Sequence, residues 1–160
     1  MNHQIEIRDI DRQEDLHACY ALMLQLRPHL QDSDAFAQQV RRQREQGFRL
    51  SGAWQGDQII GAIGYRLQEN LLYGSFVFVD DLIVDEQLRS RGIGALLLDV
   101  ARAYAQKLHC RQFVLDTGLH MALAQRFYYR QGLLAHAMGF HEELSSSTER
   151  SGTAQARTTE

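Results

Sequence analysis

Residues 76–84 read FVFVDDLIV, residues 85–94 read DEQLRSRGIG and residues 95–101 read ALLLDVA. The first segment is rich in β-branched and aromatic residues, which is typical of a buried strand. From Ile93 onward, Leu97, Ala101 and Tyr104 recur at helical spacing. This stretch therefore predicts a strand that enters a helix through a short turn.

The turn has the spacing R-x-x-G-x-G, formed by Arg89, Gly92 and Gly94. Glycines allow backbone N–H groups to approach an anion closely, and the N-terminus of the next helix adds unpaired N–H groups and a positive dipole end. The spacing lacks the Lys-Ser/Thr pair of a P-loop and the first glycine of the dinucleotide fingerprint. It predicts a pyrophosphate site of another kind, and the alternative is an ordinary turn whose glycines serve packing.

Upstream, alternation at residues 5–7 predicts a short first strand. Asp11 and Glu14 have the spacing of a capping box that opens a first helix. We expect this helix to stop near Arg27, because a residue that precedes a proline, here Pro28, is pushed out of the helical region. The N-terminal part is therefore predicted to be a strand followed by a helix.

A second, mostly polar helix is predicted from a cap at Asp32 to Gly47. The period then changes to that of strands, and residues 48–84 predict an antiparallel meander with reversals at 55–58 and 71–75. The polar character of this helix predicts that it lies largely on the surface.

Downstream, residues 111–116 (RQFVLD) predict a fifth strand, which a helical crossover makes parallel to the fourth. A fourth helix is predicted over 121–130, with Gly132 as its left-handed cap. A last strand is expected at 134–142. The order predicts a mixed α+β fold with one mostly antiparallel sheet.

Composition indicates one soluble domain, assigned to residues 1–144, with a flexible polar tail at 145–160. The net charge of −3 gives no reason to expect nucleic acid, and no apolar run suggests a leader or a membrane span. We therefore expect a cytoplasmic protein without a membrane partner. Cys19 and Cys110 are expected to be reduced, and the scattered histidines predict no metal site.

A second motif lies on the fourth predicted helix, where residues 124–133 read AQRFYYRQGL. Together with R-x-x-G-x-G and the order of elements over residues 5–143, it resembles the GNAT superfamily of acyl-CoA-dependent N-acetyltransferases. The family often has asparagine where this chain has Met121, which removes one side-chain contact to the cofactor. The resemblance implies a sheet of six to seven strands with splayed parallel fourth and fifth strands and four flanking helices. It also implies acetyl-CoA as acyl donor, and a homodimer is a further expectation.

In the family, the pantetheine arm of CoA bonds the exposed backbone of the fourth strand, at positions that match Leu82 and Val84. The N–H of Leu82 would also polarise the acetyl carbonyl. Arg89 would contribute charge to the pyrophosphate site, although Arg89 and Arg91 also have the simpler reading of solvated surface charges. The full set of cofactor-binding residues implied is Leu82, Ile83, Val84, Leu88, Arg89, Ser90, Arg91, Gly92, Ile93, Gly94, Ala124 and Phe127.

Tyr128 matches the family's general acid, with a core tyrosine as the alternative. For the base, strict strand alternation places Asp80 on the face of Leu82, where partial desolvation would raise its pKa. Asp81 is the second choice, and the two acids have the alternative roles of holding the substrate ammonium or capping backbone. His120 and His136 are weaker candidates for the base.

The acceptor region implied by the resemblance draws on Leu26, Asp32, Tyr65, Tyr73 and His136. Acids in this region favour a small cationic primary amine, such as a polyamine or an aminoglycoside. The alternatives are a protein lysine or N-terminal acetyltransferase, and a catalytically idle CoA-binding regulatory module.

Overall fold

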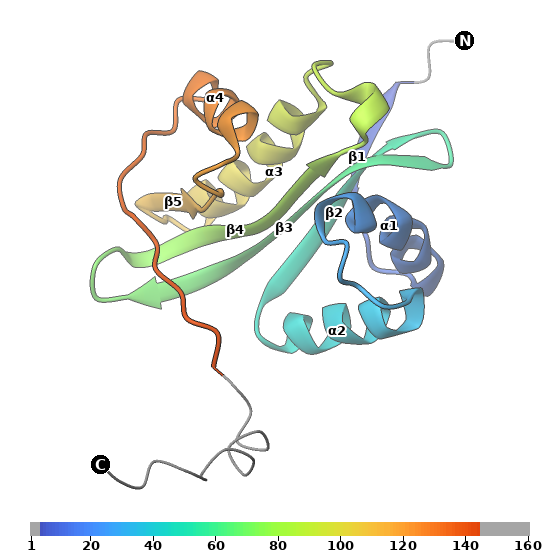
Figure 1. Ribbon diagram of the computed structural model, residues 1–160, viewed down its shortest axis with the longest axis horizontal. Helices are drawn as coiled ribbons and strands as arrows, with labels where there is room; N and C mark the ends of the chain where they lie inside the picture. Colours follow the sequence, from blue (N-terminus) through green and yellow to red (C-terminus); the bar gives the residue numbers. More distant parts are fainter. Residues whose placement is uncertain (1–3, 145–160) are drawn as a thin grey trace, which may run out of the picture.

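The computed structural model describes residues 4–144, which form one five-stranded sheet in the order β1-β2-β3-β4-β5 with helices against it (Figure 1). This confirms the mixed α+β fold, but the strands number five instead of six to seven. The elements are β1 (Ile5–Asp9), α1 (Gln13–Leu26), α2 (Ser33–Glu45), β2 (Phe48–Gln55), β3 (Gln58–Asn70), β4 (Gly74–Val84), the short 3-10 helix η1 (Glu86–Leu88), α3 (Ile93–Lys107), β5 (Gln112–Leu115) and α4 (Ala122–Arg130).

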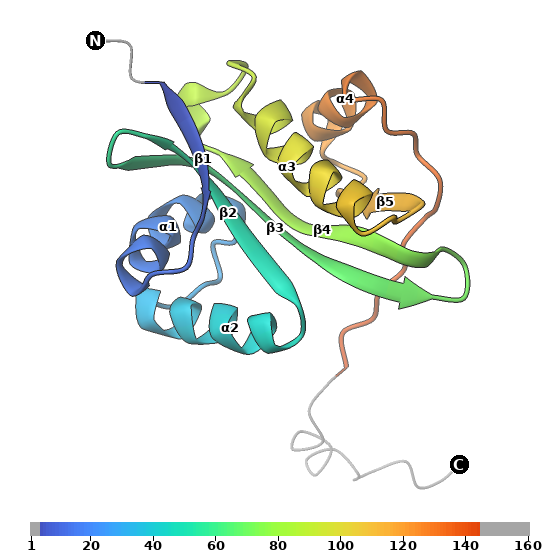
Figure 2. The same cartoon turned by 180° about the vertical axis from the view of Figure 1, so that it is seen from behind.

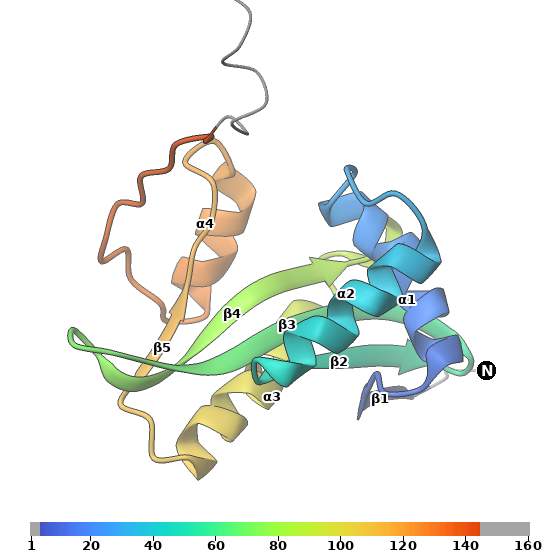
Figure 3. The ribbon, with the colours of Figure 1, turned by 90° about the horizontal axis from the view of Figure 1, so that it is seen from below.

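The sheet separates two hydrophobic cores. On one face, α1 and α2 pack Leu16, Phe36 and their neighbours against β2 and β3. On the other face, α3 packs Leu97 and Ala101 against β3 and β4. Figures 2 and 3 show α3 crossing the sheet on the side opposite to α1. The sheet is therefore held from both faces, and its β4–β5 end carries the features that the sequence singles out.

The parallel pair is confirmed, and it is short. β4 pairs with β5 only from Phe76 to Val79, whereas the first four strands are antiparallel. β4 then continues to Val84, while β5 ends at Leu115. The β5-facing side of residues 80–84 therefore has no strand partner within the described chain.

A β-bulge interrupts β4 at this point. Tyr65 pairs with Val79 and Gly64 pairs with Asp81, so Asp80 is the extra residue. As a result Val79 and Leu82, three residues apart, both pack into the core under α3. The strict alternation predicted from the sequence, which put Asp80 on the face of Leu82, is therefore wrong.

The starts of α1 and α2 test the capping residues predicted from the sequence. Asp32 caps α2 as predicted, and its side chain accepts a hydrogen bond of 2.7 Å from the N–H of Ala35. The capping box at Asp11 is wrong, because α1 begins one residue later, with Arg12 at the N-cap and no side-chain cap bond. The stop of α1 before Arg27 is confirmed.

The strand predicted at 134–142 is also wrong. After Leu133, which packs against the core under α3, residues 134–144 are exposed and contain no strand. An alternating pattern makes a strand only where a neighbour supplies backbone hydrogen bonds, and the described residues provide none here. The predicted tail at 145–160 lies outside the described residues.

Candidate active site at the end of strand β4

The open side of β4 is the central feature of the site. Residues 80–84 present backbone groups toward β5 that no described strand pairs, while Leu82 and Val84 pack against the core under α3. Ile83 is buried on the other face, in the core under α1. An extended ligand with amide groups can hydrogen-bond to such a strand as an added strand would.

The loop that follows β4 turns directly into the start of α3. Ser90 and Gly92 both have left-handed φ values, 66° and 79°, and Gly92 is the N-cap of α3. Left-handed residues in a tight turn direct successive N–H groups toward one point, which favours an anion. A Cβ at Gly92 would meet nothing within 4 Å, so the space above it is open for a ligand. We call this loop, residues 88–94, the cradle.

The second motif supports the cradle from α4. A Cβ at Gly94 would lie 3.0 Å from Cζ of Phe127, so the absence of a side chain at Gly94 lets the ring pack there. Ala124 lies one turn earlier on α4 and is half-buried. The two motifs that are about 30 residues apart in the sequence therefore meet in one place.

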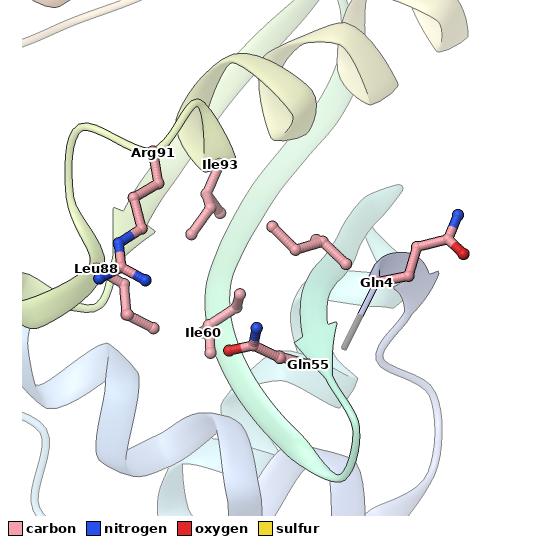
Figure 4. A pocket seen from close by; sticks show the side chains of 7 residues that line it. Gln4, Gln55, Ile60, Leu88, Arg91 and Ile93 are labelled. Carbon is pink, nitrogen blue, oxygen red and sulfur yellow. The ribbon is translucent and has the colours of Figure 1, made fainter. Parts of the chain in front are cut away.

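The two arginines of the loop lie differently. Arg89 is exposed, and its Nε donates a long hydrogen bond of 3.5 Å to the carbonyl of Val84. Arg91 lines a pocket of about 430 Å³ together with residues at β1, β2 and β3 (Figure 4). This pocket is lined by Gln4, Ile5, Gln55, Ile60, Leu88, Arg91 and Ile93.

Tyr128 extends from α4 toward the core under α3. Its ring packs against this core and lies 5.4 Å from the ring of Phe127. Its hydroxyl makes no hydrogen bond with any residue in the described part of the chain, and burial raises the pKa of the phenol. The neighbouring Tyr129 is exposed. Tyr128 is therefore a protonated phenol at neutral pH with an unused donor.

The bulge directs both acids of β4 toward arginines. Asp80 accepts a hydrogen bond of 2.8 Å from Nε of Arg66 on β3. Asp81 lies 2.9 Å from Nη2 of Arg27, at the end of α1. Burial raises the pKa of Asp81, and Arg27 opposes part of this rise. Asp81 is therefore a partly desolvated carboxyl with a raised pKa, a property that suits a general base.

A family model for the acetyltransferase (GNAT) family matches residues 11–133, about three quarters of the chain. The chain belongs to the GNAT family. A curated relative, the uncharacterized N-acetyltransferase YhdJ of Bacillus subtilis (strain 168), is 26% identical over 125 residues, covering 78% of this chain and 87% of the relative.

Two solved structures share this GNAT fold. The aminoglycoside N-acetyltransferase AAC(6')-Iy in complex with CoA has a TM-score of 0.77 and 18% identity, covering 88% of this chain and 95% of that chain. The ribosomal-protein-alanine N-acetyltransferase from Brucella melitensis biovar Abortus 2308 has a TM-score of 0.75 and 17% identity, covering 89% and 100%.

GNAT enzymes use acetyl-CoA as acetyl donor, and this protein is an acyl-CoA-dependent N-acetyltransferase. The open backbone of β4 and the space above Gly92 fit the extended arm and the pyrophosphate of CoA. Within residues 4–144, no group of three or more His, Cys, Asp or Glu side chains is arranged to hold a metal ion. No helix in this range is long and apolar enough to cross a membrane.

The structure brings together only some of the residues predicted for the acceptor region of this GNAT domain. The Tyr73 hydroxyl, in the β3–β4 turn, and Nδ1 of His136 are 3.5 Å apart. Tyr65 is 2% exposed and packs edge-on against Tyr104 under α3, so it belongs to the core and cannot line an acceptor pocket. Leu26 packs against the core under α1, and Asp32 caps α2.

Sequence reasoning missed two residues of the site, Arg27 and Arg66. A signal for the bulge that orients their partners was present, because a glycine within a strand, here Gly64, often marks a bulge or a close approach. A Cβ at Gly64 would lie 2.5 Å from Cζ of Phe48 and 3.1 Å from Oδ2 of Asp81. No pattern pointed to Arg27, because its contact to β4 spans 54 positions of sequence.

Proposed function

We propose that the protein transfers the acetyl group of acetyl-CoA to the primary amine of a small cationic acceptor by direct attack. The observation that carries this proposal is the unpaired backbone of residues 80–84, which leads into the cradle. Tyr128 packs against the same core as Leu82, and Asp81 follows the bulge one residue before Leu82. In the proposal, the acetyl donor, the acid and the base therefore lie around one end of β4.

Each residue has a distinct role in the proposal. Acetyl-CoA supplies a thioester whose C–S bond breaks as the amine nitrogen bonds to the carbonyl carbon. The N–H of Leu82 stabilises charge on the carbonyl oxygen. Asp81, directly or through water, takes a proton from the amine, and Tyr128 gives its proton to the departing thiolate. Asp80 is the alternative base, although Arg66 holds its carboxylate.

The cationic class is supported by acids at the α1–α2 loop. Asp32 and Asp34 have no Lys or Arg partner among the described residues, and Asp34 faces only His17, at 3.4 Å. Asp80 and Asp81 contribute less, because each is already paired with an arginine. The solved aminoglycoside N-acetyltransferase with this fold acts on acceptors of this class.

A protein or peptide amine is the second candidate. It is favoured by the exposed apolar side chains after α4, where Leu134, Met138 and Phe140 are 82%, 66% and 91% exposed. Exposed apolar residues along an extended segment are typical of surfaces that contact other chains.

Thiol release from acetyl-CoA, measured across a panel of amines, tests the proposal. The panel contains a polyamine, an aminoglycoside, a lysine peptide and a peptide with a free N-terminal alanine. Turnover with the first two supports the small cationic class, and turnover only with peptides supports the second candidate. Calorimetric binding of acetyl-CoA without release for any amine would indicate an idle CoA-binding module.

A further inference from the structure

Arg27 connects the end of α1 to the bulge in β4. It is the C-cap residue of α1 and precedes Pro28, so its side chain starts from the edge of the predicted acceptor region. Its Nε lies 3.0 Å from Oδ1 of Asp81, and its Nη2 lies 2.9 Å from the same oxygen. Nη2 also donates a hydrogen bond of 3.1 Å to the carbonyl of Asp80. One guanidinium thus holds both residues of the bulge.

This geometry leaves the two carboxylate oxygens of Asp81 unequal. Oδ1 accepts a hydrogen bond from Nε of Arg27 and forms an ion pair with Nη2, whereas Oδ2 has no hydrogen-bond donor among the described residues. The Asp81 side chain is 16% exposed, so few orientations are open to it. Oδ2 is therefore the oxygen that is free to accept a proton.

We infer that Arg27 is a positioning residue for the transfer reaction: it holds Oδ1 of Asp81 and the backbone of Asp80, and so presents Oδ2 of Asp81 as the base. This inference rests on the proposed function, in which Asp81 is the base. A planar guanidinium suits the role, because two of its nitrogens reach one oxygen while one of them also reaches a carbonyl.

The charges around Asp81 define how this arrangement responds to pH. Arg27 faces it from α1, Arg66 faces it from β3, and Asp80 is its neighbour on β4; the buried thiol of Cys19 on α1 is the remaining titratable group. Burial and Asp80 raise the pKa of Asp81, whereas Arg27 and Arg66 lower it. Arg27 is the larger of the two favourable charges, so its removal leaves Asp81 with a higher pKa.

The test compares Arg27→Met and Arg27→Lys with the parent enzyme over a pH series. A carboxylate base is active when deprotonated, so a higher pKa moves the acidic limb of kcat/KM to higher pH. We expect Arg27→Met to show this move together with a loss of kcat of roughly tenfold or more. Arg27→Lys keeps the positive charge but loses the planar guanidinium that contacts two oxygens at once. The acidic limb of its kcat/KM profile therefore stays near that of the parent while kcat falls.

Three controls separate this inference from the proposed function. Calorimetric affinity for acetyl-CoA stays at the parent value in both variants, which also reports that they fold. Arg12→Met removes an arginine that pairs with Asp15 at 3.1 Å, at the opposite end of α1 from Arg27, and leaves the profile unchanged. Asp81→Asn removes the acidic limb of the kcat/KM profile if Asp81 is the base. An acidic limb that remains in Asp81→Asn would refute the assignment of Asp81 as the base.

The inference on Arg27 fails in two ways that do not touch the proposed function. One is an acidic limb that stays in place in Arg27→Met while Asp81→Asn removes it. The other is an Arg27→Lys enzyme with the kcat of the parent, which would show that the planar guanidinium is not needed.

Discussion

At the scale of single residues, removing the Tyr128 hydroxyl distinguishes a catalytic role of this side chain from a packing role. Tyr128→Phe removes a proton donor that bonds to no described residue, while the ring keeps its place in the core under α3. We expect turnover to fall roughly tenfold or more, with acetyl-CoA affinity and melting temperature close to the parent. Steady-state thiol release, calorimetry and thermal unfolding measure the three quantities.

Tyr129→Phe is the matched control for Tyr128→Phe, because Tyr129 is the adjacent tyrosine and is exposed. It should leave turnover unchanged. A variant at Tyr128 that loses stability without a selective loss of rate would return Tyr128 to a structural role.

A substitution at Gly92 tests whether the cradle binds acetyl-CoA. Val at position 92 would fill the open space above the loop and would also have to adopt a φ of 79°, which β-branched residues avoid. We expect Gly92→Val to bind acetyl-CoA at least roughly a hundredfold more weakly in calorimetry, because the anion can no longer approach the N–H groups. Gly56→Val is the control for strain, since Gly56 has a φ of 62° with nothing within 4 Å and lies in the β2–β3 turn. Equal affinities in the two variants would contradict a role for the cradle.

The residues of the candidate site could be predicted from the sequence to different degrees. Gly92, Gly94 and Phe127 could be proposed for the CoA site because short motifs encode them, and in the structure Phe127 packs against Gly94. Arg27 was not, because its role depends on a contact between distant segments that no local pattern records. Tyr65 was misplaced for a related reason: an aromatic residue on a strand faces either side of the sheet, and only the pairing decides which.

At the scale of elements, the bulge in β4 depends on Gly64. A Cβ there would lie 2.5 Å from Cζ of Phe48, a buried ring that cannot move away easily, and 3.1 Å from Oδ2 of Asp81. We expect Gly64→Ala to lower the free energy of unfolding by about 1–3 kcal/mol through overpacking. Chemical denaturation measures this loss. Gly139→Ala, at a site with nothing within 4 Å, should be nearly neutral, and equal stability of the two variants would contradict the close packing at the bulge.

Sequence periodicity predicts the order of the helices and strands but not every detail of the sheet. Strands, helices and the parallel crossover follow from local patterns, and the structure confirms their order. The bulge shifts the faces of β4 by one residue, a change that the composition of the strand does not reveal. The segment at 134–142 has a strand-like pattern, but a strand also needs a partner, which is a property of the whole sheet.

At the scale of the whole molecule, the unpaired stretch of β4 predicts where a bound ligand protects the backbone. Acetyl-CoA that pairs with residues 80–84 and fills the cradle stabilises the folded state by mass action, by about 2.7 kcal/mol at a hundred times its Kd. Hydrogen exchange should therefore slow most at residues 80–94 when acetyl-CoA is added. The far edge, where β1 pairs with β2, should show only the smaller change that follows from global stabilisation. Protection centred on the pocket lined by Ile5 and Gln55, with residues 80–84 unchanged, would show that the cofactor does not use the open side of β4.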